Sequence, residues 1–396
     1  MIHSLDPNMA TLEQPSALAS RRRLFSLGLP KCNDLSERRF PLTPEGARML
    51  VEQGFTVRME SGAADTIHYT DNQYAAAGVR ITSRGEVLGS DIVIHLADLH
   101  PMDVRQMRRG ALLLTLLTPM RVNRDTVVAL LDRHIISVAV NLIRDERGNL
   151  PFADILDEVD GRAAMARASS FLADSVHGKG ILLGGVAGVG PCEVMIIGSG
   201  IAACAAARSA TGAGALVRMF DNDVYRLREA TRLLGPSVVA SAMHPRVMAN
   251  ALRTADVLIY TSVSQSPVFD CESISDMKRG LIIFDLSEDP GVAFPSLPTV
   301  DLALASPLDI SPTEPSRACY VNAGSAVART AAMALSNTFS TMFSQLVDCD
   351  GVTNALNLHS GLQAATFTFL GKVVNRKVAE MVGRRAVDIR IFLTLS

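Results

Sequence analysis

A glycine-rich turn at residues 198–203 has the residue types and spacing of a phosphate-binding loop. It reads G-S-G-I-A-A, which fits the pattern G-x-G-x-x-[G/A] with Ala203 in the last position. Gly198 allows a sharp turn, Gly200 lets the backbone approach a pyrophosphate, and Ala203 allows the next helix to pack closely on the preceding strand. The N-terminus of that helix offers N–H groups and a positive dipole end to phosphates. The turn therefore predicts a dinucleotide site.

Asp221 indicates which dinucleotide the turn would hold. It ends a second, mainly apolar run that begins after Gly214. An aspartate roughly 20 residues beyond the glycines accepts hydrogen bonds from both ribose hydroxyls, and its charge repels a 2′-phosphate. We therefore expect NAD rather than NADP. A glycine turn with a purely structural role is the alternative, because the glycine motif alone is a weak signal.

The segments around this turn alternate between strand and helix patterns and predict a doubly wound Rossmann sheet. Residues 194–197 are apolar and β-branched, as in a buried parallel strand, and a helix of small residues follows the turn. The later segments are a helix at 223–234, a strand at 238–243, a helix at 246–254, a strand at 257–263, a helix at 271–279 and a strand at 281–286. About five parallel strands are enough for such a sheet.

A second α/β domain is expected from the first third of the chain, where strands also alternate with short helices. The expected strands are 24–28, 55–59, 91–96, 111–117 and 135–140, and the expected helices are 44–53, 71–77, 101–109 and 124–133.

A long helix at 154–176 is expected to connect the two domains, with Asp154 or Asp157 at its start and Gly178 as its stop. Helical patterns at 325–346 and 352–363 would return the chain to the first domain. We therefore expect an N-terminal extension (1–24), a discontinuous substrate domain (25–153 and 323–396) and an NAD-binding Rossmann domain (154–322).

Composition restricts the class of protein. The chain has 396 residues, 48% of them hydrophobic, and a net charge of −2. That length favours two domains, and that charge gives no reason to expect a nucleic-acid partner. The cysteines lack CxxC or Cys/His spacing, which indicates a cytoplasmic protein with reduced thiols and no metal site. Residues 181–205 are apolar, but their glycines favour a buried strand over a membrane span.

Several short motifs carry a family resemblance. In chain order they are ERRFPLTP at 37–44, similar to ENRVALTP; DEVDGR at 157–162, similar to SEVAGR; HGKGILLGGV at 177–186, similar to GGKGILLAGV; DLSEDPG at 285–291, similar to DVAIDQGG; and VART at 327–330, similar to VPRT. With these motifs in this order, the chain resembles the alanine dehydrogenase/transhydrogenase α-subunit family from about Lys31 to the C-terminus. It is most similar to the alanine dehydrogenase branch.

This resemblance implies a fold, a cofactor and a reaction. The fold is a two-domain α/β protein with a cleft between the domains and NAD(H) on the second domain. The reaction is the reversible oxidative deamination of an amino acid to a 2-oxo acid by hydride transfer. Alanine dehydrogenases form hexamers, so a homo-oligomer, hexamer or dimer, is expected here.

Two residues match the family's substrate-binding positions. Arg39 matches the arginine that binds the substrate carboxylate, a task that suits a planar guanidinium because it can hold both oxygens at once. Asp289 matches the aspartate near the nicotinamide and the substrate amine, where its charge would stabilise a cation. The structural alternatives are a surface arginine beside Arg38 and a turn cap before Pro290.

Two further residues match positions near the cofactor. Arg226 matches an arginine beside the adenosine ribose, although a solvated helix arginine is the alternative. Asn322 matches the asparagine before the family's MPGAV segment, which suggests contact with the nicotinamide end. Residues 323–325 depart from that segment, which makes the detail of this contact doubtful.

The family's proton-handling positions are changed. The lysine of the family's KVKEP stretch falls on Ala97, and the histidine of its FTYLH stretch falls on Thr118. Neither replacement carries a proton near neutral pH, although moving protons is typically worth ~10²–10⁴-fold in rate. His95 would share a strand face with the missing lysine and is the substitute we expect; Asp98 and His100 are close by. A structural histidine at a strand end is the alternative.

The sequence therefore predicts an NAD-dependent oxidoreductase that acts on the CH–NH2 or C=N group of an amino, imino or 2-oxo acid other than alanine. A catalytically silent NAD(H)-binding regulatory or structural subunit is a second hypothesis. Ordinary alanine dehydrogenase is a third, and it requires a different alignment across residues 94–118.

Overall fold

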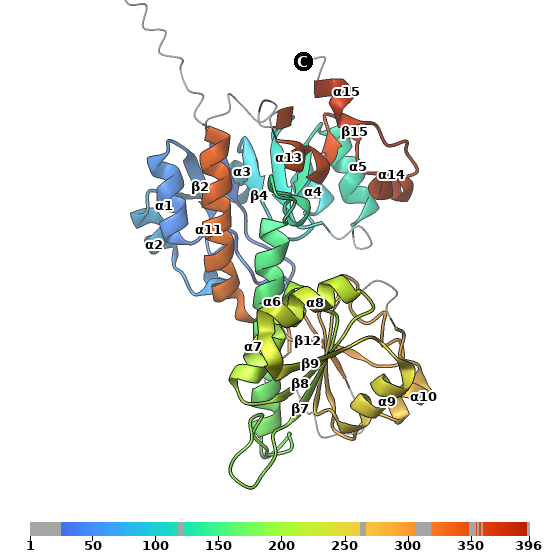
Figure 1. The fold of residues 1–396 in the computed structure, drawn as a ribbon. Coiled ribbons are helices and arrows are strands. Elements are labelled where there is room, and N and C mark those ends of the chain that lie inside the picture. The colour runs from blue at the N-terminus through green and yellow to red at the C-terminus, as the bar shows by residue number, and fades with distance from the viewer. Residues whose placement is uncertain are drawn as a thin grey trace, which may run out of the picture.

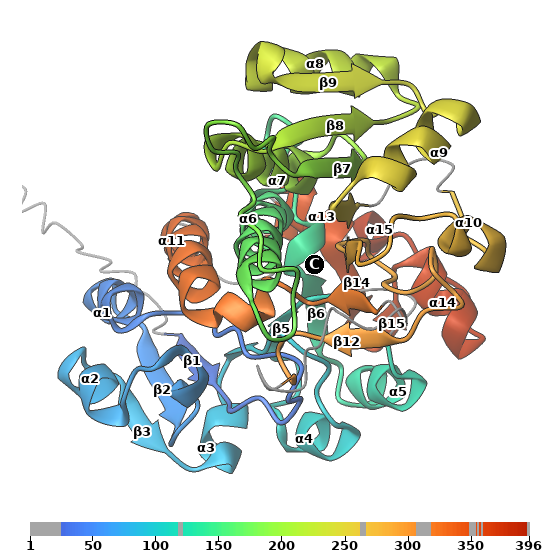
Figure 2. The same ribbon diagram turned by 90° about the horizontal axis from the view of Figure 1, so that it is seen from below.

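The computed structural model describes residues 25–117, 122–261, 267–305, 318–347, 354, 356–357 and 359–393. The chain forms two α/β lobes, each built on a largely or wholly parallel sheet (Figures 1 and 2). The predicted two-domain α/β fold is thereby confirmed. Within the described ranges, no helix is both long and apolar enough to cross a membrane.

The sheet of the first lobe contains the five strands that were predicted from the N-terminal third, together with three that were not. Its order is β15-β14-β6-β5-β4-β1-β2-β3. The strands are β1 (Ser26–Leu29), β2 (Thr56–Glu60), β3 (Arg80–Thr82), β4 (Ile92–Ile94), β5 (Leu112–Thr115), β6 (Ile136–Ala139), β14 (Thr366–Phe369) and β15 (Lys372–Val373). The first six pair in parallel, and β14 pairs antiparallel with β6 and β15. The C-terminal segment thus completes this sheet.

Helices cover both faces of the first sheet. They are α1 (Pro44–Glu52), α2 (Asp71–Ala76), α3 (Arg84–Leu88), α4 (Pro101–Gln106), α5 (Arg124–Asp132), α11 (Ala328–Val347), α13 (Ser360–Ala365), α14 (Arg376–Val382) and α15 (Ile389–Leu393). Side-chain caps explain where two of these helices begin. The Thr43 side chain accepts a hydrogen bond from Gly46 N at α1, and the Asn123 side chain accepts one from Asp125 N at α5. Much of the helix expected at 352–363 lies outside the described residues.

The second sheet is parallel throughout and has the order β12-β13-β11-β10-β7-β8-β9. Its strands are β7 (Glu193–Ile197), β8 (Leu216–Phe220), β9 (Val238–Ser241), β10 (Val257–Tyr260), β11 (Ile282–Asp285), β12 (Thr299–Asp301) and β13 (Cys319–Val321). Its helices are α7 (Ile201–Gly212), α8 (Val224–Leu234), α9 (Pro245–Thr254) and α10 (Cys271–Ser275). Strands β12 and β13 were not expected; the predicted count of about five strands was therefore too low.

Helix α6 (Pro151–Ala173) passes from one lobe to the other and packs on α7 and α11 (Figure 1). Its first turns bury Phe152 and Leu156 in the core of the first lobe, and its last turns bury Phe171 and Leu172 in the core of the second. The expected starts at Asp154 or Asp157 were wrong, because Pro151 occupies the first helical turn. The helix also ends at Ala173, before Gly178.

Candidate active site and dinucleotide site

The glycine turn lies at the carboxyl end of β7, as expected for a dinucleotide site. Gly198 has φ +108°, a conformation that side-chain-bearing residues rarely adopt, and its N–H donates to Phe220 O at 2.7 Å. Gly200 is the N-cap of α7, and a Cβ built there meets nothing within 4 Å. The first N–H groups of a helix have no intrahelical acceptor. The open space beside Gly200 therefore fits a pyrophosphate at the N-terminus of α7.

Asp221 follows β8 and faces the same turn. Its Oδ2 accepts a hydrogen bond of 2.6 Å from Ser199 Oγ, and its Oδ1 accepts one of 2.9 Å from Asp223 N. The side chain is buried, so these two bonds fix its orientation. Each carboxylate oxygen has a second lone pair left for a ribose hydroxyl. The contribution of Ser199 was not foreseen, although its place between the two glycines could have suggested it.

Ala203 and Arg226 lie in opposite environments. Ala203 is fully buried in the core beneath α7, where its small side chain allows the close helix–strand packing that the motif requires. Arg226 lies on the first turn of α8, is largely exposed, and approaches Asp223 only to 3.6 Å. Its guanidinium is thus free to reorient toward a ligand, and its role beside the adenosine stays a prediction.

Arg39 lies at the other end of the site, where it pairs with Glu37. Its Nε donates to Glu37 Oε1 at 2.8 Å, and its Nη2 donates to Oε2. Both side chains are largely buried. Burial disfavours the guanidinium charge, but the charge and hydrogen bonds of Glu37 outweigh it, so the pKa of Arg39 is raised. Arg39 is therefore charged, oriented and not part of a solvated surface cluster.

The loop that carries Arg39 is fastened to the segment after β13. Asn322 has a positive φ of 61° and donates from Nδ2 to Ser36 O at 2.7 Å. Ser325 Oγ donates to the same carbonyl at 2.8 Å and accepts from Arg38 N at 2.9 Å. Asn322 therefore joins the two lobes through its amide, and contact with the nicotinamide stays a prediction.

His95 is buried at the carboxyl end of β4. Its Nδ1 donates to Ala97 O at 2.6 Å, because a carbonyl can only accept. Its Nε2 is buried and has no hydrogen-bond partner among the described residues. Burial lowers the pKa of His95, so the ring is a neutral tautomer with an open acceptor at Nε2. Burial disfavours the protonated ring, and a catalytic role for His95 stays a prediction.

The neighbours of His95 have structural tasks. His100 is the N-cap of α4 and accepts from Met102 N at 3.2 Å. Asp98 accepts from Asn123 N at 3.0 Å, and burial raises its pKa. Ala97 offers only its carbonyl, and Thr118 lies outside the described residues.

An ion-pair network beneath the Arg39 loop was not predicted. Arg84 donates to Glu60 at 2.7 Å, to Asp103 at 2.7 Å and to Lys31 O at 2.9 Å. It joins the end of β2, the first turn of α4 and the loop after β1, which are far apart in the sequence. No local motif could have revealed it.

Asp289 lies in the loop after β11 and is half-buried. The loop is organised by Asp285, which accepts from Ser287 N at 2.9 Å and Gly291 N at 2.8 Å. Within the described part of the chain, the Asp289 side chain makes no hydrogen bond or ion pair, so it does not cap the turn. Its negative charge is available to a ligand.

Two carboxylates of α6, Asp157 and Asp160, were not among the predicted site residues. Asp160 Oδ1 accepts from Gly324 N at 2.6 Å, and the side chain interacts electrostatically with Arg39. Burial raises the pKa of Asp160. Asp157, one turn earlier, is exposed to solvent, yet crowding by protein and the charges of Asp160, Asp154 and Glu288 raise its pKa to about 7.

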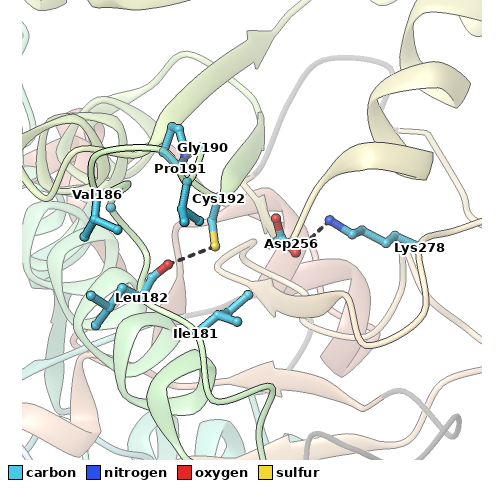
Figure 3. Close-up of a pocket in the computed structure, with 10 residues that line it drawn as sticks. Ile181, Leu182, Val186, Gly190, Pro191, Cys192, Asp256 and Lys278 are labelled. Atoms are coloured by element: carbon cyan, nitrogen blue, oxygen red, sulfur yellow. Dashed lines mark hydrogen bonds and ion pairs between the residues drawn. The ribbon is translucent and has the colours of Figure 1, made fainter.

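A hollow of about 340 Å³ lies at the opposite edge of the second sheet, near the amino ends of its strands (Figure 3). There Asp256 accepts hydrogen bonds from Lys179 at 2.9 Å and Lys278 at 2.8 Å. Its lining residues are Ile181, Leu182, Gly184, Val186, Val189, Gly190, Pro191, Cys192, Asp256 and Lys278. Because it faces away from Gly198 and Asp221, we assign it no part in the chemistry.

Comparison with known proteins gives matches over nearly the whole chain. Residues 28–156 match the model of the alanine dehydrogenase/PNT N-terminal domain, and residues 164–376 match that of the C-terminal domain. Alanine dehydrogenase of Staphylococcus haemolyticus is 30% identical over 368 residues, which are 91% of this chain and 96% of that protein. Alanine dehydrogenase of Bacillus subtilis is 30% identical over 366 residues, 90% of this chain and 94% of that one.

Solved structures give the same fold. An L-alanine dehydrogenase superposes with a TM-score of 0.77 at 24% identity, over 90% of this chain and 99% of that chain. A transhydrogenase from Sinorhizobium meliloti superposes with a TM-score of 0.71 at 18% identity, over 89% of this chain and 99% of that chain.

Proposed function

The chain belongs to the alanine dehydrogenase/PNT family, and from this membership we propose a specific reaction for it. The family makes it an NAD(H)-dependent oxidoreductase that acts on CH–NH2 groups. The proposal is that it moves hydride between NAD(H) and the α-carbon of an amino, imino or 2-oxo acid other than alanine.

The dinucleotide would be held by the turn at Gly198 and Gly200. The open space beside Gly200 supports a pyrophosphate at the N-terminus of α7, and the buried Asp221 would accept from the ribose hydroxyls. Bound NAD(H) supplies or accepts the hydride. The charge of Asp221 favours NAD over NADP.

The substrate would be held between Arg39 and Asp289. Glu37 occupies the Nε–Nη2 edge of the Arg39 guanidinium, so a substrate carboxylate would bind at the remaining Nη1 edge. Asp289 would stabilise the ammonium or the iminium cation at the other end of the substrate. His95 Nε2 has no hydrogen-bond partner among the described residues, so it could take a proton from the substrate and return it.

The proposal that the substrate differs from alanine depends on one observation. At the position of the family's lysine stands Ala97, whose carbonyl is already bonded to His95 Nδ1. A methyl group neither orients a substrate nor carries a proton, so alanine chemistry in its usual form lacks a required group.

The test is NADH oxidation by the purified full-length protein with a panel of 2-oxo acids, each with ammonia or a primary amine. We expect turnover with a 2-oxo acid other than pyruvate. Tight NADH binding without turnover of any acid would instead indicate a silent NAD(H)-binding subunit. Pyruvate and ammonia as the best pair would indicate ordinary alanine dehydrogenase.

Assembly is the second part of the proposal. The hairpin around Val186 and Val189 exposes these side chains and, next to it, Leu182. Exposed apolar side chains gathered on one element are typical of protein–protein contacts. A homo-oligomer, hexamer or dimer, would cover them. Analytical ultracentrifugation of the wild-type protein and of the Val186→Asp variant tests this part of the proposal. We expect the wild type to form the oligomer and the variant to have lost it.

A further inference from the structure

Two segments of the chain that cross between the lobes are bonded to each other. The first is helix α6, and the second, called here the second crossing, is residues 322–327, which lead from β13 to α11. Asp160, near the middle of α6, accepts a hydrogen bond of 2.6 Å from Gly324 N in the second crossing. This bond therefore restricts movement of one crossing past the other.

Glycine at position 324 is explained by this bond and not by the backbone conformation. The φ of −69° and ψ of −34° at Gly324 suit any residue, and a proline would also fit that φ. A Cβ built at Gly324, however, lies 2.3 Å from Asp160 Oδ1, which is closer than real contacts allow. A side chain there would turn the carboxylate away, and a proline would also remove the N–H that donates to it. The bond to Asp160 therefore requires glycine at this position.

Ser325 bonds the second crossing to the loop that carries Arg39. Its side chain is buried, and its Oγ donates to Ser36 O at 2.8 Å and accepts from Arg38 N at 2.9 Å. These two backbone groups lie on either side of Glu37, which is the partner of Arg39. The hydroxyl of Ser325 therefore holds the backbone from which the Glu37–Arg39 pair projects.

The motif comparison distinguishes the same three residues. Aligned with the family's SEVAGR, the segment DEVDGR has Asp160 in place of alanine. Aligned with the start of MPGAV, this chain has Gly324 in place of proline and Ser325 in place of glycine. The family motifs thus have neither the carboxylate nor the N–H of the first bond, and they lack the hydroxyl of Ser325. All three groups occur together in this chain.

We propose that Asp160 and Ser325 are positioning residues, whose hydrogen bonds to and from the second crossing set the distance between Arg39 and the lobe that would hold NAD(H). This inference rests on the proposed function and names two further residues for it. Hydride transfer requires the reacting atoms to lie within ~3–3.5 Å of each other. The substrate carboxylate would be held by Arg39 of the first lobe and the cofactor by the second lobe. The bonds that join the lobes beside Arg39 therefore place the substrate α-carbon against the nicotinamide.

The first experiment compares the full-length wild type with S325A and S336A in the oxidation of the amino acid that the wild type accepts. Ser336 is the matched control, because it is also buried and its Oγ also makes two hydrogen bonds, with Thr43 N at 3.1 Å and Thr43 Oγ1 at 3.2 Å, but within the first lobe.

For S325A we expect kcat to fall ~10–100-fold, because the substrate would be displaced from the nicotinamide. KM should change less than about threefold, because Arg39 keeps both bonds to Glu37 and the edge that binds a carboxylate. S336A should keep kcat within about twofold of the wild type, since it lies away from the lobe boundary. The dissociation constant of NADH should be unchanged in both variants.

The second experiment separates the hydrogen bond of Asp160 from its charge. D160N keeps an Oδ1 acceptor for Gly324 N, whereas D160A removes it. We expect kcat to fall ~10-fold or more in D160A and to stay within about threefold of the wild type in D160N. Rescue by the amide would show that the bond, and not the negative charge, is needed.

Thermal unfolding supplies a readout without substrate and tests whether Asp160 and Gly324 act as a pair. D160A and G324A should each lower Tm by ~2–5 °C, because each breaks the same bond. The double variant D160A/G324A should have a Tm no lower than that of D160A, since two substitutions that remove one shared interaction are not additive. S325A and S336A should lower Tm by similar amounts, so loss of stability would not explain a loss of kcat in S325A alone.

The outcomes separate this inference from the proposed function. An active wild type with an equally active S325A, or an S336A that loses as much kcat as S325A, overturns the role of Ser325. Equal losses of kcat in D160N and D160A, or additive losses of Tm in D160A/G324A, overturn the role of Asp160. A wild type that binds NADH but turns over none of the acids overturns the proposed function and this inference with it.

Discussion

The Arg39 guanidinium and the Glu37 carboxylate are joined by two parallel hydrogen bonds, from Nε to Oε1 at 2.8 Å and from Nη2 to Oε2. The pair leaves one guanidinium edge for a ligand and fixes the direction in which that edge points. Because a lysine ammonium has no planar edges, it could not bind Glu37 and a substrate carboxylate in this way.

Arg39→Lys should therefore impair substrate binding. We expect KM for the amino or 2-oxo acid to rise about 10–100-fold, since a charge-assisted hydrogen bond is worth about 1.5–3 kcal/mol. The dissociation constant of NADH should not change. The matched control is Arg38→Lys in the same loop, because the Arg38 guanidinium donates to Ala303 O. Equal effects of both substitutions on KM would contradict the assignment of Arg39.

The second prediction concerns Asp221. Asp221→Asn keeps an acceptor for Ser199 Oγ but removes the negative charge. The dissociation constant of NADH should therefore rise about 10-fold or more. The ratio of NADPH to NADH dissociation constants should fall, because the charge that repels the 2′-phosphate is gone. Asp223→Asn, two residues later, keeps its capping role at α8 and should leave both affinities unchanged. Fluorescence titration with NADH and with NADPH measures the two dissociation constants. An undiminished preference for NADH in Asp221→Asn would exclude Asp221 as its cause.

The parts of the fold that were predicted from sequence depend on signals within one continuous segment. The turn at Gly198 and the acid at Asp221 belong to one strand–helix–strand unit, and each strand there is a buried apolar run. In contrast, β14 pairs with β6 from a distant part of the chain. Neither segment has a sequence pattern that predicts the pairing of Thr366 with Val138. Such contacts are set by packing and not by local pattern.

The site was predicted less completely for the same reason. Glu37 lies two residues before Arg39 and could have been recognised as its partner, because opposite charges so close in sequence can form an ion pair. Asp160 was noted only as part of the DEVDGR motif, because nothing in the local sequence shows that it reaches Gly324 and Arg39. The burial that lowers the pKa of His95 is likewise a property of the folded chain.

The third prediction concerns the contact of α6 with α7. A Cβ added to Gly161 would lie 2.2 Å from Ala202 O, so Gly161→Ala should force the helices apart and destabilise the protein by ~1–3 kcal/mol. Because α7 carries the pyrophosphate turn, NADH should also bind more weakly. The control is Gly212→Ala at the end of α7, where a Cβ meets nothing within 4 Å. That variant should be as stable as the wild type or up to ~1 kcal/mol more stable.

Urea unfolding with and without NADH separates the two effects of Gly161→Ala. If this variant and Gly212→Ala have the same urea midpoint, the close contact between α6 and α7 would not be needed for stability.

The fourth prediction concerns pH. Burial lowers the pKa of His95 below its ordinary value, so the unfolded chain binds a proton that the folded chain does not. The stability that His95 contributes is present above pH ~6.5 and is lost as pH falls below it. His95→Gln should therefore lose less stability between pH 7.5 and 5.5 than the wild type. His244→Gln, at an exposed position, should behave as the wild type does. The measurement is the urea midpoint at each pH.

Helix α6 has one more consequence, because it is unbroken and belongs to the cores of both lobes. Rotation of one sheet against the other cannot occur by bending at its middle without breaking helical hydrogen bonds. We therefore expect an opening motion to separate Ser36 from Asn322 and Ser325. These two bonds lie next to Arg39 in the chain. If Arg39 binds the substrate as proposed, we expect product release to require separation of the Arg39 loop from the segment after β13.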